Sequence, residues 1–153
     1  MSFTFMLECH IAAKAERVFA ALADLEGAKE WMQDLVSLRK TTEGPFGVGT
    51  QWEETRRMFG KNDTEYFEVT HYEPPASMSV FVDGSKGSTG KGRYLFHYEV
   101  TPDGEGSRVT LASELDIPGV FTRAFGWLFI GSFKRAMKKD LHAMKEHVEA
   151  QSG

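Results

Sequence analysis

The chain has 153 residues, of which 41% are hydrophobic, and this suits one domain with a sizeable core. Its net charge of −4 and isoelectric point near 5.7 argue against nucleic-acid binding, which normally requires a basic surface. The single cysteine, Cys9, excludes an intrachain disulfide and any multi-cysteine metal site, and it favours a reducing compartment. We therefore expect one cytoplasmic domain over residues 1–153.

Neither a signal peptide nor a membrane span is expected. The first ten residues carry Glu8 and lack a basic segment. The longest apolar stretch, residues 119–133, is interrupted by Arg123 and is shorter than the ~20 residues of a membrane-spanning helix.

The N-terminal third predicts a strand followed by two short helices. Residues 2–11 alternate between an apolar and a polar face, which is typical of a strand with one buried side. From Ala12 the apolar spacing becomes helical and predicts a helix that stops near Asp24. Gly27 separates it from a second short helix that ends around Trp31.

The middle of the chain predicts six strands separated by turn residues. The expected strands are 35–42, 50–59, 64–73, 77–83, 92–101 and 107–117. Residues 84–92 contain four glycines, and we expect a mobile hairpin there. This segment lacks the context of a phosphate-binding loop, so nucleotide binding is not expected.

The C-terminal part predicts one long helix. Residues 117–119 (Ile-Pro-Gly) end the sheet, and the helix runs from there to about Ala150. Its apolar stripe follows steps of three and four residues: Ile130, Phe133, Met137, Leu141, Met144 and Val148. A stripe this long must lie along an equally long surface, and the predicted sheet is the candidate.

Five segments carry a resemblance to a known superfamily. They are Ile11–Phe19, Asp24–Trp31, Gly47–Trp52, Val69–Pro75 with its Tyr-x-Pro-Pro turn, and Ser107–Thr110. With the order of elements, they make the chain resemble the START-like (Bet v 1-like, SRPBCC) superfamily, within its polyketide cyclase/dehydrase and lipid-transport-like group. The resemblance implies an α+β helix-grip fold, in which a curved antiparallel seven-stranded sheet wraps around the long C-terminal helix.

The helix-grip fold implies a ligand cavity between the sheet and the long helix. Strand alternation orients some of the side chains that would line it, if Trp52 points inward. The expected ligand-binding residues are Trp52, Met58, Phe67, Tyr94, Phe96, Tyr98 and Phe133.

Three polar residues are candidates for acid–base chemistry in such a cavity. Glu54 and Arg56 share the face of Trp52, and a buried acid beside a base could transfer a proton in an aldol-type ring closure. The alternatives are an outward-facing strand or a simple salt bridge. His71 shares the expected inward face of Val69 and could act as a general base, or it could be a rim residue beside the turn. No set of residues has metal-ligand spacing, so we expect neither a metal nor a cofactor.

The start of the long helix is apolar almost all round, and we call its residues Phe121 to Phe129 the Phe121–Phe129 patch. Two interpretations stay open: the second short helix and neighbouring loops cover the patch, or it is an exposed contact surface. One turn further on come four basic residues, which suit a solvated face or an anionic membrane surface: Lys134, Arg135, Lys138 and Lys139.

Three functions follow as hypotheses. The leading one is the binding or transfer of a small hydrophobic or amphipathic ligand in the cavity. The second is an enzyme of the polyketide cyclase/dehydratase type that uses Glu54, Arg56 or His71. The third is an interaction module whose Phe121–Phe129 patch contacts a partner, a second copy of the chain or, transiently, a membrane.

Overall fold

Within residues 2–58, 60–88 and 90–152, which are those that the computed structural model describes, seven strands form one antiparallel sheet. The side chains of residues 120–124 and 152 lie outside this description. The strands are β1 (Ser2–Ile11), β2 (Leu35–Lys40), β3 (Gln51–Met58), β4 (Lys61–Glu73), β5 (Ser77–Asp83), β6 (Arg93–Asp103) and β7 (Gly106–Asp116). Their order across the sheet is β1-β7-β6-β5-β4-β3-β2, so β1 and β2 are its edges.

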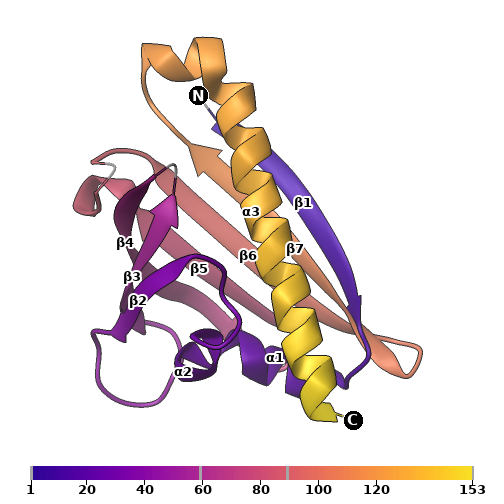
Figure 1. Cartoon of the computed structure of the whole chain (residues 1–153). Coiled ribbons are helices and arrows are strands. Elements are labelled where there is room, and N and C mark those ends of the chain that lie inside the picture. The colour runs from indigo at the N-terminus through magenta and orange to yellow at the C-terminus, as the bar shows by residue number, and fades with distance from the viewer. Residues whose placement is uncertain (1, 59, 89, 153) are drawn as a thin grey trace.

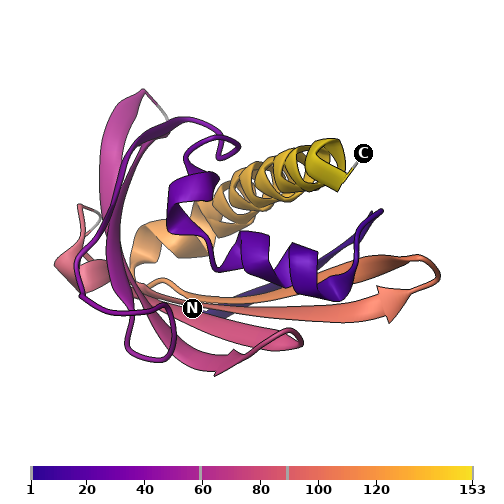
Figure 2. The ribbon, with the colours of Figure 1, turned by 90° about the horizontal axis from the view of Figure 1, so that it is seen from below.

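The sheet curves around the long helix α3 (Val120–Ser152), which lies on its concave side (Figures 1 and 2). The short helices α1 (Ala15–Leu22) and α2 (Leu25–Ala28) lie near the C-terminal end of α3 (Figure 1). Asp24 begins α2, because its carboxylate accepts a hydrogen bond of 3.0 Å from the backbone of Gly27. These elements confirm the expected α+β helix-grip fold.

The inward-facing apolar side chains of β1 and the apolar stripe of α3 pack against each other and form part of the core. Phe5, Leu7 and Ile11 of β1 face inward, and Phe133 of α3 packs edge-on against Phe5 with ring centroids 6.1 Å apart. α3 lies close to β1 and to α1, whereas β3, β4 and β5 face it from further away. Side chains and a cavity occupy the space between α3 and these three strands.

Element boundaries differ from expectation mainly at the turns. β6 and β7 extend to a tight hairpin in which Asp103 pairs with Gly106 and Gly104 has a positive φ of 64°. Pro102 and Asp103 therefore continue the strand, and the turn is confined to Gly104 and Glu105. In the glycine-rich segment, residues 84–86 form a short 3₁₀ helix, η1 (Gly84–Lys86), and the backbone of Ser88 donates a hydrogen bond of 2.8 Å to the carbonyl of Thr64.

The Phe121–Phe129 patch is not covered by the second short helix. Phe121 lies outside the described side chains, but Phe125, Trp127 and Leu128 are 49%, 71% and 50% exposed. α2 lies near the opposite end of α3 and so is not beside them (Figure 1). Phe129 differs, because it is half-buried and packs against Phe133. The interpretation that these exposed side chains are covered is therefore wrong.

Two glycines of α3 provide a matched test of this packing. A methyl group at Gly131 would meet nothing within 4 Å, so Gly131→Ala should stabilise the protein by about 1 kcal/mol through helix propensity. A methyl group at Gly126 would lie 2.6 Å from Phe3 Cζ, so Gly126→Ala should lose this gain as Phe3 is displaced. Thermal denaturation of both variants measures the difference, and equal melting temperatures would contradict the packing of Phe3 under α3.

Candidate functional site

A cavity of about 240 Å³ lies between the concave face of the sheet and α3. Its walls come from β3 to β6 on one side, from α3 on the other, and from α2 and the residues around it at one end. The volume is slightly below the roughly 300–1,000 Å³ of pockets for drug-sized molecules, so it suits a small ligand.

Aromatic side chains form part of the apolar wall, beside a larger number of aliphatic and Met side chains. Phe133 of α3 lies at the centre, with ring centroids 6.1 Å from Phe96 and 6.3 Å from Tyr94, both in stacked orientations. On the other flank, Trp52 and Phe67 stack almost parallel at 5.3 Å. These rings give the cavity flat apolar walls.

Uninterrupted alternation along β3 turns four side chains into this cavity. Trp52, Glu54, Arg56 and Met58 all line it. Glu53 and Arg57, between them, point to the other face, where Glu53 meets the Arg39 guanidinium of β2 at 3.4 Å. This one strand therefore contributes both apolar and charged side chains to the site.

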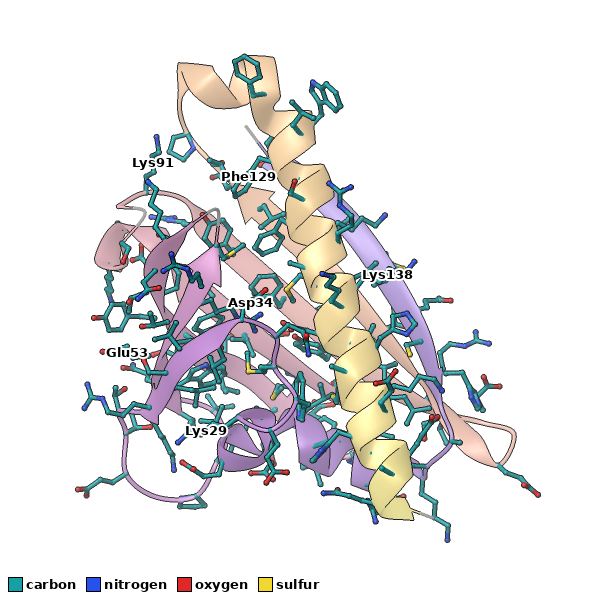
Figure 3. All side chains as sticks on the ribbon, viewed as in Figure 1. Lys29, Asp34, Glu53, Lys91, Phe129 and Lys138 are labelled. Atoms are coloured by element: carbon teal, nitrogen blue, oxygen red, sulfur yellow. The ribbon has the colours of Figure 1, made fainter. Side chains whose placement is uncertain are left out.

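Glu54 and Arg56 form a buried charged cluster with Asp140 of α3. Arg56 Nε donates to Glu54 Oε2 at 2.7 Å, and a terminal nitrogen of Arg56 donates to Asp140 Oδ2 at 2.5 Å. The second carboxylate oxygen of Asp140 accepts a bond of 3.1 Å from the backbone of Gln33, and Trp52 Nε1 donates to Glu54 Oε1 at 3.5 Å. The hydrogen bond from the backbone of Gln33 holds the loop after α2 against α3. Figure 3 labels Asp34, the next residue in this loop.

The cluster contains two carboxyl groups for one guanidinium, and burial disfavours the second negative charge. Burial raises the pKa of both Glu54 and Asp140, although the charge of Arg56 opposes this. Burial also acts to lower the pKa of Arg56, but the two carboxylates outweigh it and raise that pKa. The guanidinium therefore stays charged, while the carboxyls keep protons to a higher pH than exposed ones do.

Tyr98 adds a neutral hydroxyl to the same cavity wall. Burial raises its pKa, and the negative charges of Asp140 and Glu54 raise it further. The hydroxyl has no hydrogen-bond partner among the described residues. It can therefore both donate to and accept from a polar atom of a ligand.

Every residue expected to bind a ligand lines the cavity. They are Trp52, Met58, Phe67, Tyr94, Phe96, Tyr98 and Phe133. Of the acid–base candidates, Glu54 and Arg56 lie at the cavity too, and the pair is a salt bridge extended by Asp140. Their roles in binding or catalysis stay predictions.

The inward orientation expected for His71 is wrong. A β-bulge between Val69 and His71 shifts the register of β4 against β5, so the alternation that holds up to Val69 is displaced by one residue. His71 Nε2 instead lies 2.8 Å from Ser77 Oγ, its ring neighbours that of His97 at 6.0 Å, and it does not line the cavity. A bulge of this kind has no sequence signal at Thr70 that alternation alone would detect.

Sequence reasoning missed Asp140. It lies three residues after Met137 and four before Met144, so it belongs to the inward stripe of α3. A charged residue inside an apolar stripe is the signal that could have identified it. Among the described residues, no three His, Cys, Asp or Glu side chains gather as metal ligands would.

The fold and the cavity define a helix-grip protein with a ligand-sized internal space. The family model described as polyketide cyclase / dehydrase and lipid transport matches residues 2–149, and the chain belongs to this family. No curated protein sequence matches the chain.

Solved structures share the same fold at low sequence identity. TTHA0849 from Thermus thermophilus is 23% identical, with a TM-score of 0.84 over 99% of this chain and 100% of that one. Ara h 8.0201 is 15% identical, with a TM-score of 0.76 over 98% and 99%. The di-domain ARO/CYC StfQ of the steffimycin biosynthetic pathway is 12% identical, with a TM-score of 0.81 over 100% of this chain and 53% of that one. At these identities the likeness shows the fold alone.

Removal of the central guanidinium tests the charged cluster. Arg56→Met should destabilise the protein by about 3–5 kcal/mol at pH 8, because it leaves two buried carboxylates without a counter-charge. Since the pKa values of Glu54 and Asp140 are raised in the folded state, the stability that they contribute is complete below their ordinary pKa values and is lost as the pH rises. The decrease in the free energy of unfolding caused by Arg56→Met should therefore be smaller at pH 5 than at pH 8.

Urea denaturation at the two pH values measures this effect. Arg57→Met is the matched control, because Arg57 is exposed on the opposite face of β3. A loss that is equal at pH 5 and pH 8, or equal in the two variants, would contradict the buried cluster.

Proposed function

We propose that this protein binds a small, predominantly apolar ligand that carries one polar group, in the cavity between the sheet and α3. The observation that carries the proposal is the composition of the wall, which is aromatic and aliphatic apart from a polar corner and the adjacent carboxyl groups of Asp63 and Glu65 on β4. That corner contains Glu54, Arg56, Asp140 and the hydroxyl of Tyr98, and Glu65 and Asp63 lie opposite Glu54 and Arg56 on the neighbouring strand β4.

The geometry supports a defined orientation for such a ligand. The rings of Phe96 and Phe133 offer flat contact to an apolar body, while Tyr98 and the remaining N–H groups of Arg56 offer hydrogen bonds to an oxygen atom. The polar corner would thus discriminate between apolar ligands of equal size. A ligand that lacks a matching polar atom would leave buried polar groups unpaired, and this would lower its affinity. Membership of a family that includes lipid transport supports the same function.

Filling the cavity should abolish binding. Ala136 lines the cavity from α3, so Ala136→Phe should remove binding of a two-ring probe such as 2-naphthol, while Ala150→Phe on an exposed position of the same helix should keep it. Tyr98→Phe should weaken binding by about 1 kcal/mol. Isothermal titration calorimetry measures all three variants. The proposal is wrong if no one- or two-ring phenol or ketone binds, or if Ala136→Phe binds as wild type does.

A second candidate function is acid–base catalysis of the cyclase/dehydratase type. The observation that favours it is the raised pKa of two carboxyls at the cavity wall beside a permanent cation. One carboxyl, in its ionised form, can remove the α-proton, and the other, in its protonated form, can donate a proton to the leaving hydroxyl, which departs as water, while Arg56 or Tyr98 polarises the carbonyl. The family includes cyclases and dehydrases, and StfQ is named as an ARO/CYC.

This candidate predicts the conversion of a one- or two-ring β-hydroxy ketone into the enone and water. Glu54→Gln should lose this turnover but keep binding, whereas Glu53→Gln on the other face of β3 should keep both. Ultraviolet absorbance of the enone follows the reaction. Binding without any turnover in wild-type protein would leave ligand binding as the function and reject catalysis of this type.

The expected location stays a reducing compartment such as the cytoplasm. Cys9 is buried and free, and burial raises its pKa, so it is not suited to disulfide exchange. Within the described part of the chain, no helix is long and apolar enough to cross a membrane.

A further inference from the structure

The first half of α3 displays large apolar side chains to solvent. Trp127 is 71% exposed and Leu128 is 50% exposed, directly beside each other on the helix. The other exposed large apolar residues outside α3 are scattered over separate elements: Met6, Val36, Val48 and Tyr66. An exposed tryptophan is costly in water, and such a side chain gathered with others marks a contact surface.

The same part of the helix is strongly basic. Residues 120–139 contain five Lys and Arg and no Asp or Glu, whereas the other 133 residues contain 13 Lys and Arg against 22 Asp and Glu. Four of these cations follow Trp127 within about three turns and are exposed: Lys134, Arg135, Lys138 and Lys139. One face of an acidic protein thus carries a separate positive region.

Helical geometry brings these residues onto one face. Trp127, Lys134 and Lys138 follow at steps of seven and four residues, so their side chains line up along α3. Phe129 and Phe133, which line the cavity, point to the opposite side. Figure 3 shows Phe129 on the flank of α3 that faces β6, and labels Lys138 on the other flank of the helix. We call Trp127, Leu128, Lys134, Arg135, Lys138 and Lys139 the α3 outer strip.

We propose that the α3 outer strip docks on the surface of an anionic lipid bilayer, with α3 lying in the plane of the interface. Trp127 and Leu128 would enter the headgroup boundary, where an indole ring is favourable. The Lys and Arg side chains would reach anionic headgroups while their alkyl stems cover apolar surface.

Charge complementarity favours this occupant. The strip pairs a small apolar end with a row of cations, and this matches an interface whose apolar layer lies below a negative one. The remainder of the chain carries a net negative charge and is repelled by the same surface, which favours an approach through this face. Docking would also bring Phe129, and with it one end of the cavity, next to the bilayer. The proposal itself does not depend on the ligand function.

Vesicle flotation tests the docking directly. Full-length protein should float with vesicles of phosphatidylcholine and phosphatidylglycerol in equal parts, and more weakly with phosphatidylcholine alone. The double variant Lys134→Glu/Lys138→Glu should lower the affinity for the anionic vesicles by more than about tenfold, because each cation near an anionic surface contributes independently. Trp127→Ala should lower it several-fold, and raised salt should reduce binding of wild-type protein.

Two matched controls separate docking from general effects. Lys14→Glu/Arg108→Glu makes the same charge change away from the strip, and Val48→Ala removes an exposed apolar side chain from a loop. Both should bind as wild type does, and circular dichroism should show that all variants are folded. The proposal is overturned if wild-type protein ignores anionic vesicles, or if the strip and control variants lose binding equally. It is also overturned if Trp127→Ala dissociates a dimer in sedimentation experiments while vesicles bind no protein.

Discussion

The ion pair between Arg56 and Asp140 joins the two walls of the cavity. Arg56 projects from β3, and Asp140 lies 84 residues later on α3. α3 packs closely on β1 and α1, so its other flank faces β3 to β5 across the cavity and not through continuous apolar packing. The pair therefore joins α3 to the sheet on the side where the cavity separates them, and it makes one corner of a largely apolar space polar.

A buried cluster of this kind is a poor device for stability alone, because apolar residues of the same volume often stabilise a core as well or better. With two carboxyls around one guanidinium, the electrostatic attraction offsets the cost of burying the charges even less completely. The position of the cluster at a cavity wall, beside the Tyr98 hydroxyl, instead supports a role in recognising or transforming a ligand. α3 then combines three tasks: its inner face closes the cavity, Asp140 completes the polar corner, and its outer strip offers a basic surface.

Local periodicity accounts for what could be predicted. β3 alternates without interruption from Trp52 to Met58, so the inward orientation of Glu54 and Arg56 followed from the sequence once Trp52 was placed inward. The same reasoning failed at His71, because the bulge after Val69 displaces the alternation and its position depends on the neighbouring strand. Asp140 was missed because a search for apolar spacing ignores a charged residue within the stripe.

The order of the elements, the two faces of each strand and the inner stripe of α3 were determined by the sequence itself, since each depends on residues a few positions apart. The tertiary structure alone decided that Asp140 meets Arg56, that His71 leaves the cavity face, and that Trp127 is exposed. These outcomes depend on how far the sheet curves and where α2 lies along α3, and both are set by contacts between segments distant in the chain.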